Sequence, residues 1–262
     1  MIYLVGAAGF VGSAFARFWD GQGIPYAAIM RGNYQQFVGR PCDILVYAAG
    51  NSKTYLADQR PLEDFSQSVA LVLRTIEDFR PGFYVLISSV DIYPDLSNPA
   101  NNHEQASFSP LRSSVYGFHK HLAELVAQKH APRWLITRLA GMVGPGLKKN
   151  PVYDILHRQP LRIHPDSQYQ FMSTDAVAHA IWQLVRGGYS RDCFNICGSG
   201  TISPRQIGGL ARMPLDTSLI SAETQPRVVH ISTEKINSIV PMPNSYQSVD
   251  AFIRGQRIGA SA

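Results

Sequence analysis

Tyr116 and Lys120 are the side chains in this sequence whose types and spacing are best suited to acid–base chemistry. They stand four residues apart in a stretch of helical pattern, so both side chains lie on one face of the expected helix. An ammonium group close to a phenol favours the phenolate and lowers a phenol pKa that is ordinarily about 10. We therefore expect Tyr116 to exchange a proton with a substrate hydroxyl or carbonyl near neutral pH.

Ser88 and Ser89 end an apolar run, and Asp91 follows shortly after them. The run predicts a buried strand, and ligands bind beyond the carboxyl ends of strands in open parallel sheets. The two serines therefore strengthen the case for Tyr116 and Lys120, whose spacing alone is common in helices. A solvated loop carboxylate is one interpretation of Asp91.

A glycine-rich turn, Gly6-Ala7-Ala8-Gly9-Phe10-Val11-Gly12, follows the first apolar run. Its glycines would permit a tight turn, a close approach of the backbone to a pyrophosphate, and packing of the next helix on the strand. The phosphates would then lie at the positive end of that helix. The position of the turn at the first strand–helix junction favours a dinucleotide site over a purely structural turn. The expected cofactor contacts in this turn are Gly6, Gly9, Phe10, Val11 and Gly12.

Arg31 follows the second predicted strand, where NAD-binding proteins usually carry an acidic residue for the ribose 2′-hydroxyl. A guanidinium group suits a 2′-phosphate instead, through charge-assisted hydrogen bonds. We therefore expect NADP as the cofactor. NAD remains the alternative if Arg31 is only a solvated residue at the end of the strand.

The elements that must position these residues alternate short apolar runs with longer amphipathic ones, which is typical of a parallel sheet covered by helices. A parallel crossover usually needs a dozen or more residues, so the short segment 31–43 predicts an abbreviated connection. The expected strands are residues 2–5, 26–30, 44–48, 84–88 and 134–138, and the expected helices are residues 11–19, 62–79 and 111–129.

Beyond residue 146 the pattern loosens and Pro becomes frequent, which predicts a second, smaller lobe. We expect residues 1–146 to form the dinucleotide-binding domain and residues 147–262 mainly a substrate-binding lobe, with the segment near 173–197 returning to the first domain. Helices are expected near residues 173–186, 203–212 and 248–254. Several cations in this lobe would attract an anionic substrate group or are simply solvated; they are Lys148, Lys149, Arg205, Arg212 and Arg227.

The composition of the 262 residues, 45% hydrophobic and 16% charged, is that of an ordinary globular protein. A net charge of +5 and a pI near 9.2 come from dispersed Lys and Arg, so we expect a small anionic ligand rather than nucleic acid. No apolar run approaches the roughly 18 residues of a membrane span, and we expect no signal peptide. The three cysteines lack metal or redox spacing, which favours free thiols in the cytoplasm; they are Cys42, Cys193 and Cys197.

Several of these segments together resemble the extended short-chain dehydrogenase/reductase family, of the NAD-dependent epimerase/dehydratase type. Tyr116-Gly117-Phe118-His119-Lys120 is similar to the Tyr-Gly-x-Ser-Lys helix of that family. Val46-Tyr47-Ala48-Ala49-Gly50 resembles its third-strand signature, and the segments 88–93 and 138–146 resemble its serine strand end and its Arg-Leu…Gly-Pro-Gly stretch. The similar motifs occur in the family's order over nearly the whole chain.

The resemblance implies an α/β fold, namely a Rossmann-type doubly wound parallel sheet with a smaller α/β substrate lobe. It implies that Ser89 hydrogen-bonds the reacting oxygen, that Tyr116 is the acid/base, and that Lys120 holds the ribose and lowers the pKa of the tyrosine. Hydride would pass between the nicotinamide and a sugar carbon. The cofactor contacts implied in addition to the glycine-rich turn are Ala48, Ala49, Gly50, Ser88, Tyr116 and Lys120.

The sequence also departs from the family pattern. Ser68 stands where the family usually has an Asn, so a water relay built on that Asn is in doubt. His119 replaces the common Ser, and we expect it to be structural or exposed. Together with His121 and His130, it is interpreted as lying on the helix surface. These histidines lack the spacing of a metal site, so we expect no metal. Val90 replaces the first of two adjacent acids of the dehydratases, which argues against elimination. Asp91 stands where epimerase-reductases of the GDP-fucose synthase type place a second acid/base residue.

The leading hypothesis is a reductase that converts a keto-sugar to its hydroxyl form with NADPH. In view of the cations, the keto-sugar is expected to be nucleotide-linked. A redox-neutral sugar epimerase with tightly held cofactor is the first alternative. A non-catalytic NADP-binding sensor or scaffold is the second. The resemblance permits a homodimer through residues 62–79 and 111–129, although helix burial within one subunit gives the same apolar pattern.

Overall fold

The computed structural model describes residues 1–259, and the chain divides into two compact units. The first unit comprises Met1–Pro94, Glu104–Leu139 and Ala178–Asn195. The second comprises Asp95–His103, Ala140–Val177 and Ile196–Ala262.

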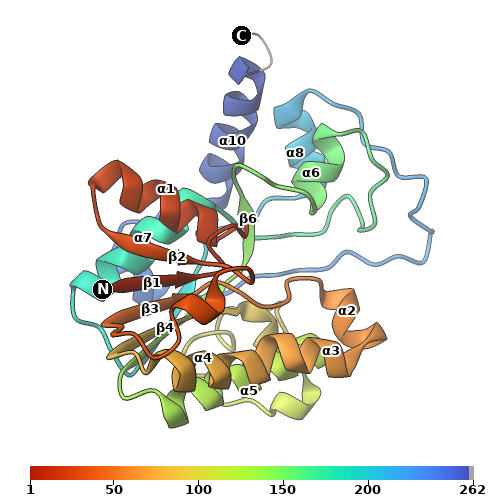
Figure 1. Cartoon of the computed structure of the whole chain (residues 1–262). Coiled ribbons are helices and arrows are strands. Elements are labelled where there is room, and N and C mark those ends of the chain that lie inside the picture. Colours follow the sequence, from red (N-terminus) through yellow and green to blue (C-terminus); the bar gives the residue numbers. More distant parts are fainter. Residues whose placement is uncertain (260–262) are drawn as a thin grey trace. The chain divides into compact units, whose positions relative to one another are not determined.

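A six-stranded sheet with the order β2-β1-β3-β4-β5-β8 is the centre of the first unit (Figure 1). The pairs among its first five strands are parallel, with Ile2 of β1 aligned with Tyr26 of β2 and Ile44 of β3. The predicted α/β fold class is confirmed, and each of the five predicted strands is correct to within one residue at either end. The strands are β1 (Ile2–Val5), β2 (Tyr26–Ile29), β3 (Ile44–Tyr47), β4 (Phe83–Ser89), β5 (Trp134–Leu139) and β8 (Asp192–Ile196).

Helices cover both faces of this sheet (Figure 1). On one face, α4 (Leu71–Phe79) and α5 (Val115–His130) pack on a cluster that includes Tyr47 and Tyr84. On the other face lie α1 (Gly12–Gln22) and α7 (Thr174–Arg186), whose Trp19 and Trp182 rings meet edge to face. All seven residues of β4 are buried, as expected for a parallel strand covered on both sides.

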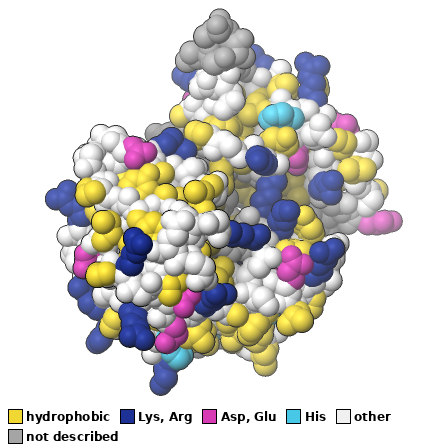
Figure 2. All heavy atoms as spheres, in the orientation of Figure 1, with side chains coloured by type: hydrophobic (Ala, Val, Ile, Leu, Met, Phe, Trp, Pro, Cys, Tyr) yellow, Lys and Arg dark blue, Asp and Glu magenta, His cyan; other side chains and the backbone are white. Residues whose placement is uncertain are grey.

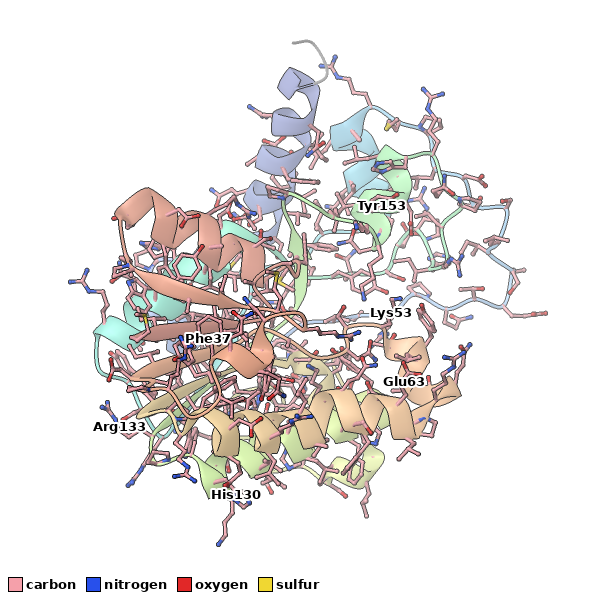
Figure 3. The ribbon with its side chains drawn as sticks, viewed as in Figure 1. Phe37, Lys53, Glu63, His130, Arg133 and Tyr153 are labelled. Carbon is pink, nitrogen blue, oxygen red and sulfur yellow. The ribbon has the colours of Figure 1, made fainter. Side chains whose placement is uncertain are left out.

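The connection between β2 and β3 is abbreviated, as predicted. It contains only a 3₁₀ turn, η1 (Tyr34–Gln36), in place of a crossover helix. Aromatic rings anchor it: Phe37, labelled in Figure 3, meets the Tyr3 ring edge to face at 5.5 Å, and the Tyr34 hydroxyl donates to Asp78 at 2.9 Å. These contacts replace the packing that a helix would supply on this part of the sheet.

The structure differs in detail from two of the predicted helices, residues 62–79 and 111–129. Residues 62–79 form α3 (Pro61–Phe65), a π-helical turn η2 (Ser66–Ala70) and then α4. Helix α5 begins at Val115 rather than at residue 111, because the Ser114 side chain accepts the Gly117 N–H and so caps the first turn. The residues before this cap form a separate 3₁₀ turn, η4 (Pro110–Arg112), and α2 (Thr54–Gln59) was not predicted.

The second unit has a parallel pair of strands, β6 (Gly141–Val143) and β7 (Phe171–Ser173), packed with helices. Its core is a cluster that includes Phe171, Ile207 and Ile253. A capping box between Ser203 and Gln206 starts α8 at the predicted place. The helices are α6 (Pro151–Leu156), α8 (Pro204–Ala211), α9 (Glu234–Asn237) and α10 (Ser245–Gly259); α10 is longer than predicted, and α6 and α9 were not predicted.

Candidate active site

Several residues singled out in the sequence lie at the carboxyl ends of neighbouring strands. Gly6 follows β1, Ala48–Gly50 follows β3, and Ser89 ends β4. From β1 the chain runs outward to β2 and then returns to β3 on the other side, so the strand order reverses between β1 and β3. Such a reversal is where open α/β sheets bind ligands.

The turn after β1 has a backbone that only glycines permit at two of its positions. Gly6 has φ +87°, and a Cβ there would lie 2.8 Å from the Ala48 carbonyl. A Cβ on Gly12 would overlap the Gly6 carbonyl oxygen. Ala8 and Gly9 are exposed, and α1 has no side-chain cap at its first turn. The turn therefore fits a dinucleotide, because its exposed backbone and the positive end of the α1 dipole can face a pyrophosphate.

Arg31 lies exposed directly after β2, on a segment that is itself fixed. The Asn33 side chain accepts the Met30 N–H at 2.7 Å and donates to the Ala28 carbonyl at 2.9 Å. These two bonds hold the backbone on both sides of Arg31. The guanidinium is thus presented at the end of β2, where the 2′-position of a bound dinucleotide would be recognised.

Ser89, Asp91 and Tyr116 are brought together. Ser89 donates its hydroxyl proton to Asp91 at 3.0 Å and caps the 3₁₀ turn η3 (Val90–Ile92) by accepting the Asp91 N–H at 3.2 Å. A Cβ on Gly117 would overlap the Asp91 carbonyl oxygen, so α5 passes very close to this turn. That close approach, which sequence reasoning missed, places the preceding residue, Tyr116, beside Ser89.

Tyr116 is buried, and its pKa is raised rather than lowered, which corrects the expectation from its spacing to Lys120. Burial is the largest cause of the raised pKa, and the carboxylates of Asp91 and Asp64 add to it, while a hydrogen bond with Ser89 opposes it. The desolvation and the two negative charges disfavour the phenolate. In this structure Tyr116 therefore keeps its proton at neutral pH.

Lys120 is also buried, with its Nζ 5.6 Å from the centroid of the Tyr116 ring. A Cβ built on Gly50 would lie 3.9 Å from this Nζ, so the ammonium group is adjacent to the turn after β3. Burial lowers the pKa of Lys120, and the carboxylates of Asp64, Glu124 and Asp91 oppose that decrease. Lys120 thus joins the tyrosine to the segment predicted to contact the cofactor.

The side chain of Ser88 is engaged inside the protein. Its hydroxyl donates to Glu124 at 2.5 Å, inside the protein. Arg138 binds the same carboxylate through two nitrogens, at 3.1 and 2.8 Å, and donates to Tyr93 at 2.9 Å. The Ser88 side chain is therefore part of a buried network, which leaves its backbone as the group that could meet a cofactor.

A second buried cluster surrounds Asp64 and was not predicted. Asp64 accepts hydrogen bonds from Asn51 at 2.7 Å and from Ser68 at 3.3 Å, and its other oxygen lies 2.7 Å from Nδ1 of His119. His119 is only 7% exposed, so the interpretation of this histidine as a helix-surface residue is wrong. Its neighbour in the sequence is Lys120, which brings the cluster to the site.

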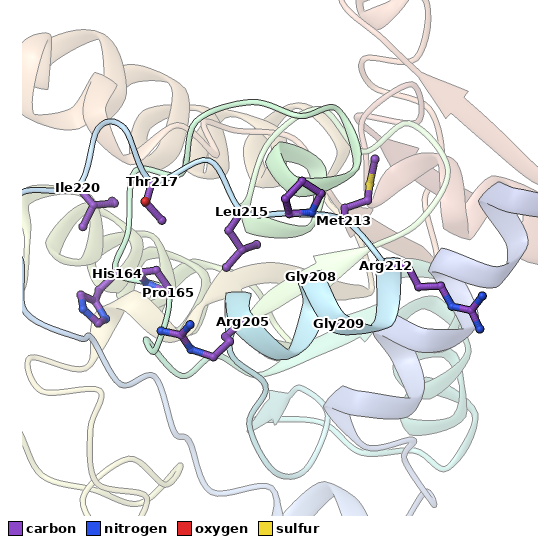
Figure 4. A pocket seen from close by; sticks show the side chains of 11 residues that line it. His164, Pro165, Arg205, Gly208, Gly209, Arg212, Met213, Leu215, Thr217 and Ile220 are labelled. Atoms are coloured by element: carbon purple, nitrogen blue, oxygen red, sulfur yellow. The ribbon is translucent and has the colours of Figure 1, made fainter.

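The second unit contains a groove of about 780 Å³ beside α8 (Figure 4). Two of the arginines predicted to attract an anion line it, Arg205 and Arg212. The Arg205 guanidinium is engaged by Asp166 through hydrogen bonds of 2.6 and 3.0 Å, whereas Arg212 is exposed at the end of the helix. A neighbouring acid thus already neutralises one of the two charges.

Basic side chains are spread among acidic and uncharged ones on the face shown in Figure 2, and they are the more frequent of the two charged types there. Within the described residues, no helix is long and apolar enough to cross a membrane. Among the residues that the structure describes, no group of three or more His, Cys, Asp or Glu side chains could hold a metal ion.

The sequence matches the family model of the NAD dependent epimerase/dehydratase family over residues 2–197. The chain belongs to this family. It is therefore an NAD(P)-dependent enzyme of the epimerase/dehydratase type, as the resemblance of its motifs implied. No curated protein matches the sequence significantly.

Solved structures of similar fold cover both epimerases and reductases. A UDP-galactose 4-epimerase matches with a TM-score of 0.80 at 17% identity, over 98% of this chain and 99% of that one. MoeE5 in complex with UDP-glucuronic acid and NAD matches with a TM-score of 0.83 at 19% identity, over 98% and 99%. The dTDP-4-dehydrorhamnose reductase of Bacillus anthracis str. Ames in complex with NADP matches with a TM-score of 0.79 at 16% identity, over 97% of each chain. At these identities the likeness shows the fold alone.

Proposed function

We propose that the protein is an NADPH-dependent reductase that converts a keto-sugar, carried on a nucleoside diphosphate, to the corresponding hydroxy-sugar. The observation that carries this proposal is the grouping of the buried Tyr116 with Ser89 and Lys120, at the sheet edge that also carries the glycine-rich turn. These residues combine a proton donor and a hydrogen-bond donor with a place for a dinucleotide.

The reductive direction uses Tyr116 as the proton donor. A phenol that keeps its proton can donate it to a carbonyl oxygen, whereas oxidation of a hydroxyl needs the phenolate as the base. Ser89 is placed to hydrogen-bond the same oxygen. The bound nicotinamide would supply the hydride for the carbonyl carbon. Tyr116 then recovers its proton from solvent, and the net reaction consumes one proton and one NADPH.

Arg31 supports NADPH as the cofactor. Arg31 is exposed, and Asn33 holds the backbone beside it. The arginine occupies the position after β2 where NAD-binding proteins usually carry an acidic residue. A carboxylate at that position would accept from a ribose 2′-hydroxyl and repel a 2′-phosphate. Two observations support a nucleotide-linked substrate. They are the exposed cations of the second unit and the nucleotide sugar bound to MoeE5, a protein of similar fold.

Exposed apolar side chains support a homodimer through the two helical segments named from the sequence. Leu62 on α3 is 79% exposed and Leu125 on α5 is 45% exposed. Val115 and Phe65 on the same helices are each 38% exposed. Pairing these segments with those of a second copy would bury this surface. A monomeric mass by light scattering would remove the dimer from the proposal.

The first test of the proposed function is the nucleotide content of freshly purified protein, followed by fluorescence titrations with NADPH and NADH. We expect little retained nucleotide and much tighter binding of NADPH. Arg31→Ala should weaken NADPH binding about tenfold or more, because a charge-assisted contact to the phosphate is lost, and leave NADH binding unchanged. Oxidation of NADPH would then be followed with nucleoside-diphosphate 4-keto-sugars.

Arg40→Ala is the matched control, since Arg40 is exposed on the same β2–β3 segment and stacks on Phe37 at 5.7 Å. It should leave both affinities as they are in the wild type. Stoichiometric retained NAD would contradict the proposal and point to the redox-neutral epimerase. Tight NADPH binding without turnover of any keto-sugar would point to a sensor or scaffold.

A further inference from the structure

The segment after β3 contains one buried polar side chain between exposed neighbours. Asn51 is only 6% exposed, although Gly50 before it and Ser52 after it are exposed. Gly50 ends the segment Ala48–Gly50, which is predicted to contact the cofactor. A polar side chain that is buried at such a place needs partners for its hydrogen-bonding groups. Asn51 finds them in its own turn and on a neighbouring helix.

The Asn51 amide closes the turn that leads into α2. Its oxygen accepts the Lys53 N–H at 2.7 Å, and its nitrogen donates to the Lys53 carbonyl at 2.8 Å. Lys53, labelled in Figure 3, lies exposed directly before α2, and its carbonyl also accepts the N–H of Leu56 at 3.0 Å. One side chain thus fixes both backbone groups of the residue before this helix, much as Asn33 holds the backbone beside Arg31 after β2.

The second proton of the Asn51 amide anchors this turn to α3. The nitrogen donates to a carboxylate oxygen of Asp64 at 2.7 Å, 13 residues later in the chain. Asp64 is fully buried and is itself held, because Ser68 donates to the same oxygen at 3.3 Å and Nδ1 of His119 lies 2.7 Å from the other. The amide keeps this orientation, since the reverse one would turn its oxygen towards the carboxylate.

The turn held in this way adjoins the groups that are to receive the dinucleotide. Gly50 has φ +106°, and a Cβ there would lie 3.4 Å from the Gln67 carbonyl oxygen and 3.9 Å from Nζ of Lys120. Two residues earlier, the carbonyl of Ala48 lies against the glycine-rich turn, 2.8 Å from where a Cβ on Gly6 would be. A different path of the chain beyond Gly50 would therefore move backbone that adjoins both Lys120 and the glycine-rich turn.

We propose that Asn51 is a positioning residue of the cofactor site: bonded to Asp64, it fixes the turn after β3 in the shape that receives the dinucleotide. A turn that is already ordered does not have to be ordered by the ligand, so loss of this bond lowers the affinity. The pyrophosphate is common to NADPH and NADH, so the two affinities should fall together. The inference rests on the dinucleotide site of the proposed function and not on its reductive direction.

The first test is fluorescence titration of the full chain with NADPH and NADH. Asn51→Ala should weaken the binding of both nucleotides about tenfold, unlike Arg31→Ala, which should act on NADPH alone. Ser68→Ala is the matched control, because it removes a different hydrogen bond to the same Asp64 oxygen, and it should leave both affinities as in the wild type. Wild-type affinities in Asn51→Ala, or an equal loss in Ser68→Ala, would overturn the proposal.

A second set of variants tests the bond to Asp64. Asp64→Ala should weaken both nucleotides as much as Asn51→Ala does, whereas Asp64→Asn should bind them nearly as the wild type does, because its amide oxygen can still accept from Asn51. The double variant Asn51→Ala/Asp64→Ala should bind no more weakly than either single variant, since both changes remove the same bond. Losses that multiply in the double variant would show that the two residues act separately and would overturn the proposal. If Asp64→Ala does not fold, Asn51→Ala and Ser68→Ala still decide the outcome.

Amide hydrogen exchange, followed by NMR, measures the turn without any nucleotide. The Lys53 N–H should exchange about tenfold faster in Asn51→Ala than in the wild type or in Ser68→Ala, because its acceptor is lost. Unchanged exchange would overturn the proposal. A wild type that binds neither nucleotide would contradict the proposed function and this inference together. Nucleotide binding that Asn51→Ala leaves intact would contradict this inference alone, and binding without turnover of any keto-sugar would contradict the reductase alone.

Discussion

Two buried polar clusters share one stripe of α5 but have different compositions. Tyr116, Lys120 and Glu124 follow one another at intervals of four residues, so their side chains lie along the same helix face. At one end, Glu124 and Arg138 form a bidentate pair with well-matched charges. At the other, Tyr116 and Lys120 have raised and lowered pKa values and lie beside the strand ends. One end holds a charge-compensated ion pair, and the other holds two groups whose charged forms are disfavoured by burial.

Tyr116→Phe should give the largest effect, a fall in NADPH-dependent turnover of about a thousandfold, because the proton donor is removed. The free energy of unfolding should stay close to that of the wild type, since the ring and its packing remain. Turnover is measured by NADPH absorbance and stability by urea unfolding. Tyr55→Phe, at an exposed position on α2, is the control and should affect neither. Retained turnover in Tyr116→Phe would remove this residue from the chemistry.

Glu124→Gln, at the other end of the stripe, should mainly lower stability rather than act on the proton donor. The buried Arg138 guanidinium loses its counter-charge, which should lower the free energy of unfolding by about 3–5 kcal/mol. Burial lowers the pKa of Arg138, and Glu124 raises it in the wild type. An arginine side chain does not lose its proton in proteins, so Arg138 stays charged in the variant near neutral pH. Circular dichroism in urea measures the loss. Glu77→Gln, an exposed position on α4, should cost almost nothing, and equal losses in the two variants would refute the contrast.

Asp91→Asn should give the smallest effect, a shift in pH dependence rather than a loss of fold. Asp91 raises the pKa of Tyr116, so its neutralisation lowers that pKa and the phenol loses its proton at a lower pH. The alkaline limb of the reductive reaction should therefore move down by about one pH unit. The measurement is kcat/KM against pH at saturating NADPH. A complete loss of turnover at every pH would instead make Asp91 a second acid–base residue.

The sequence predicted best what depends on local pattern. Five strands and the short β2–β3 connection followed from apolar runs and segment lengths, and the glycine-rich turn followed from spacing. The limits of α5 were wrong because the Ser114 cap outweighs the apolar residues before it. No local signal marks the close approach of Gly117 to the Asp91 carbonyl, since it depends on the packing of α5 against the turn after β4.

Long-range contacts also explain the errors at the site. An acid in the first turn of a helix, such as Asp64, ordinarily faces the solvent and complements the helix dipole, so its burial had no sequence signal. His119 was assigned to the surface because its partner lies 55 residues earlier in the chain. The pKa of Tyr116 was predicted with the wrong sign because the spacing reveals Lys120 but neither the burial nor the carboxylates.

The π-helical turn at Ser66–Ala70 makes the Asp64 cluster sensitive to chain length. Each residue of an α-helix turns the chain by about 100°, so an added residue rotates everything before it relative to everything after it. Loss of a single codon within this turn would restore a regular helix and turn the Asp64 carboxylate away from His119, with no change in either residue. A change of chain length within this turn would therefore alter the site as surely as a substitution of Asp64 or His119.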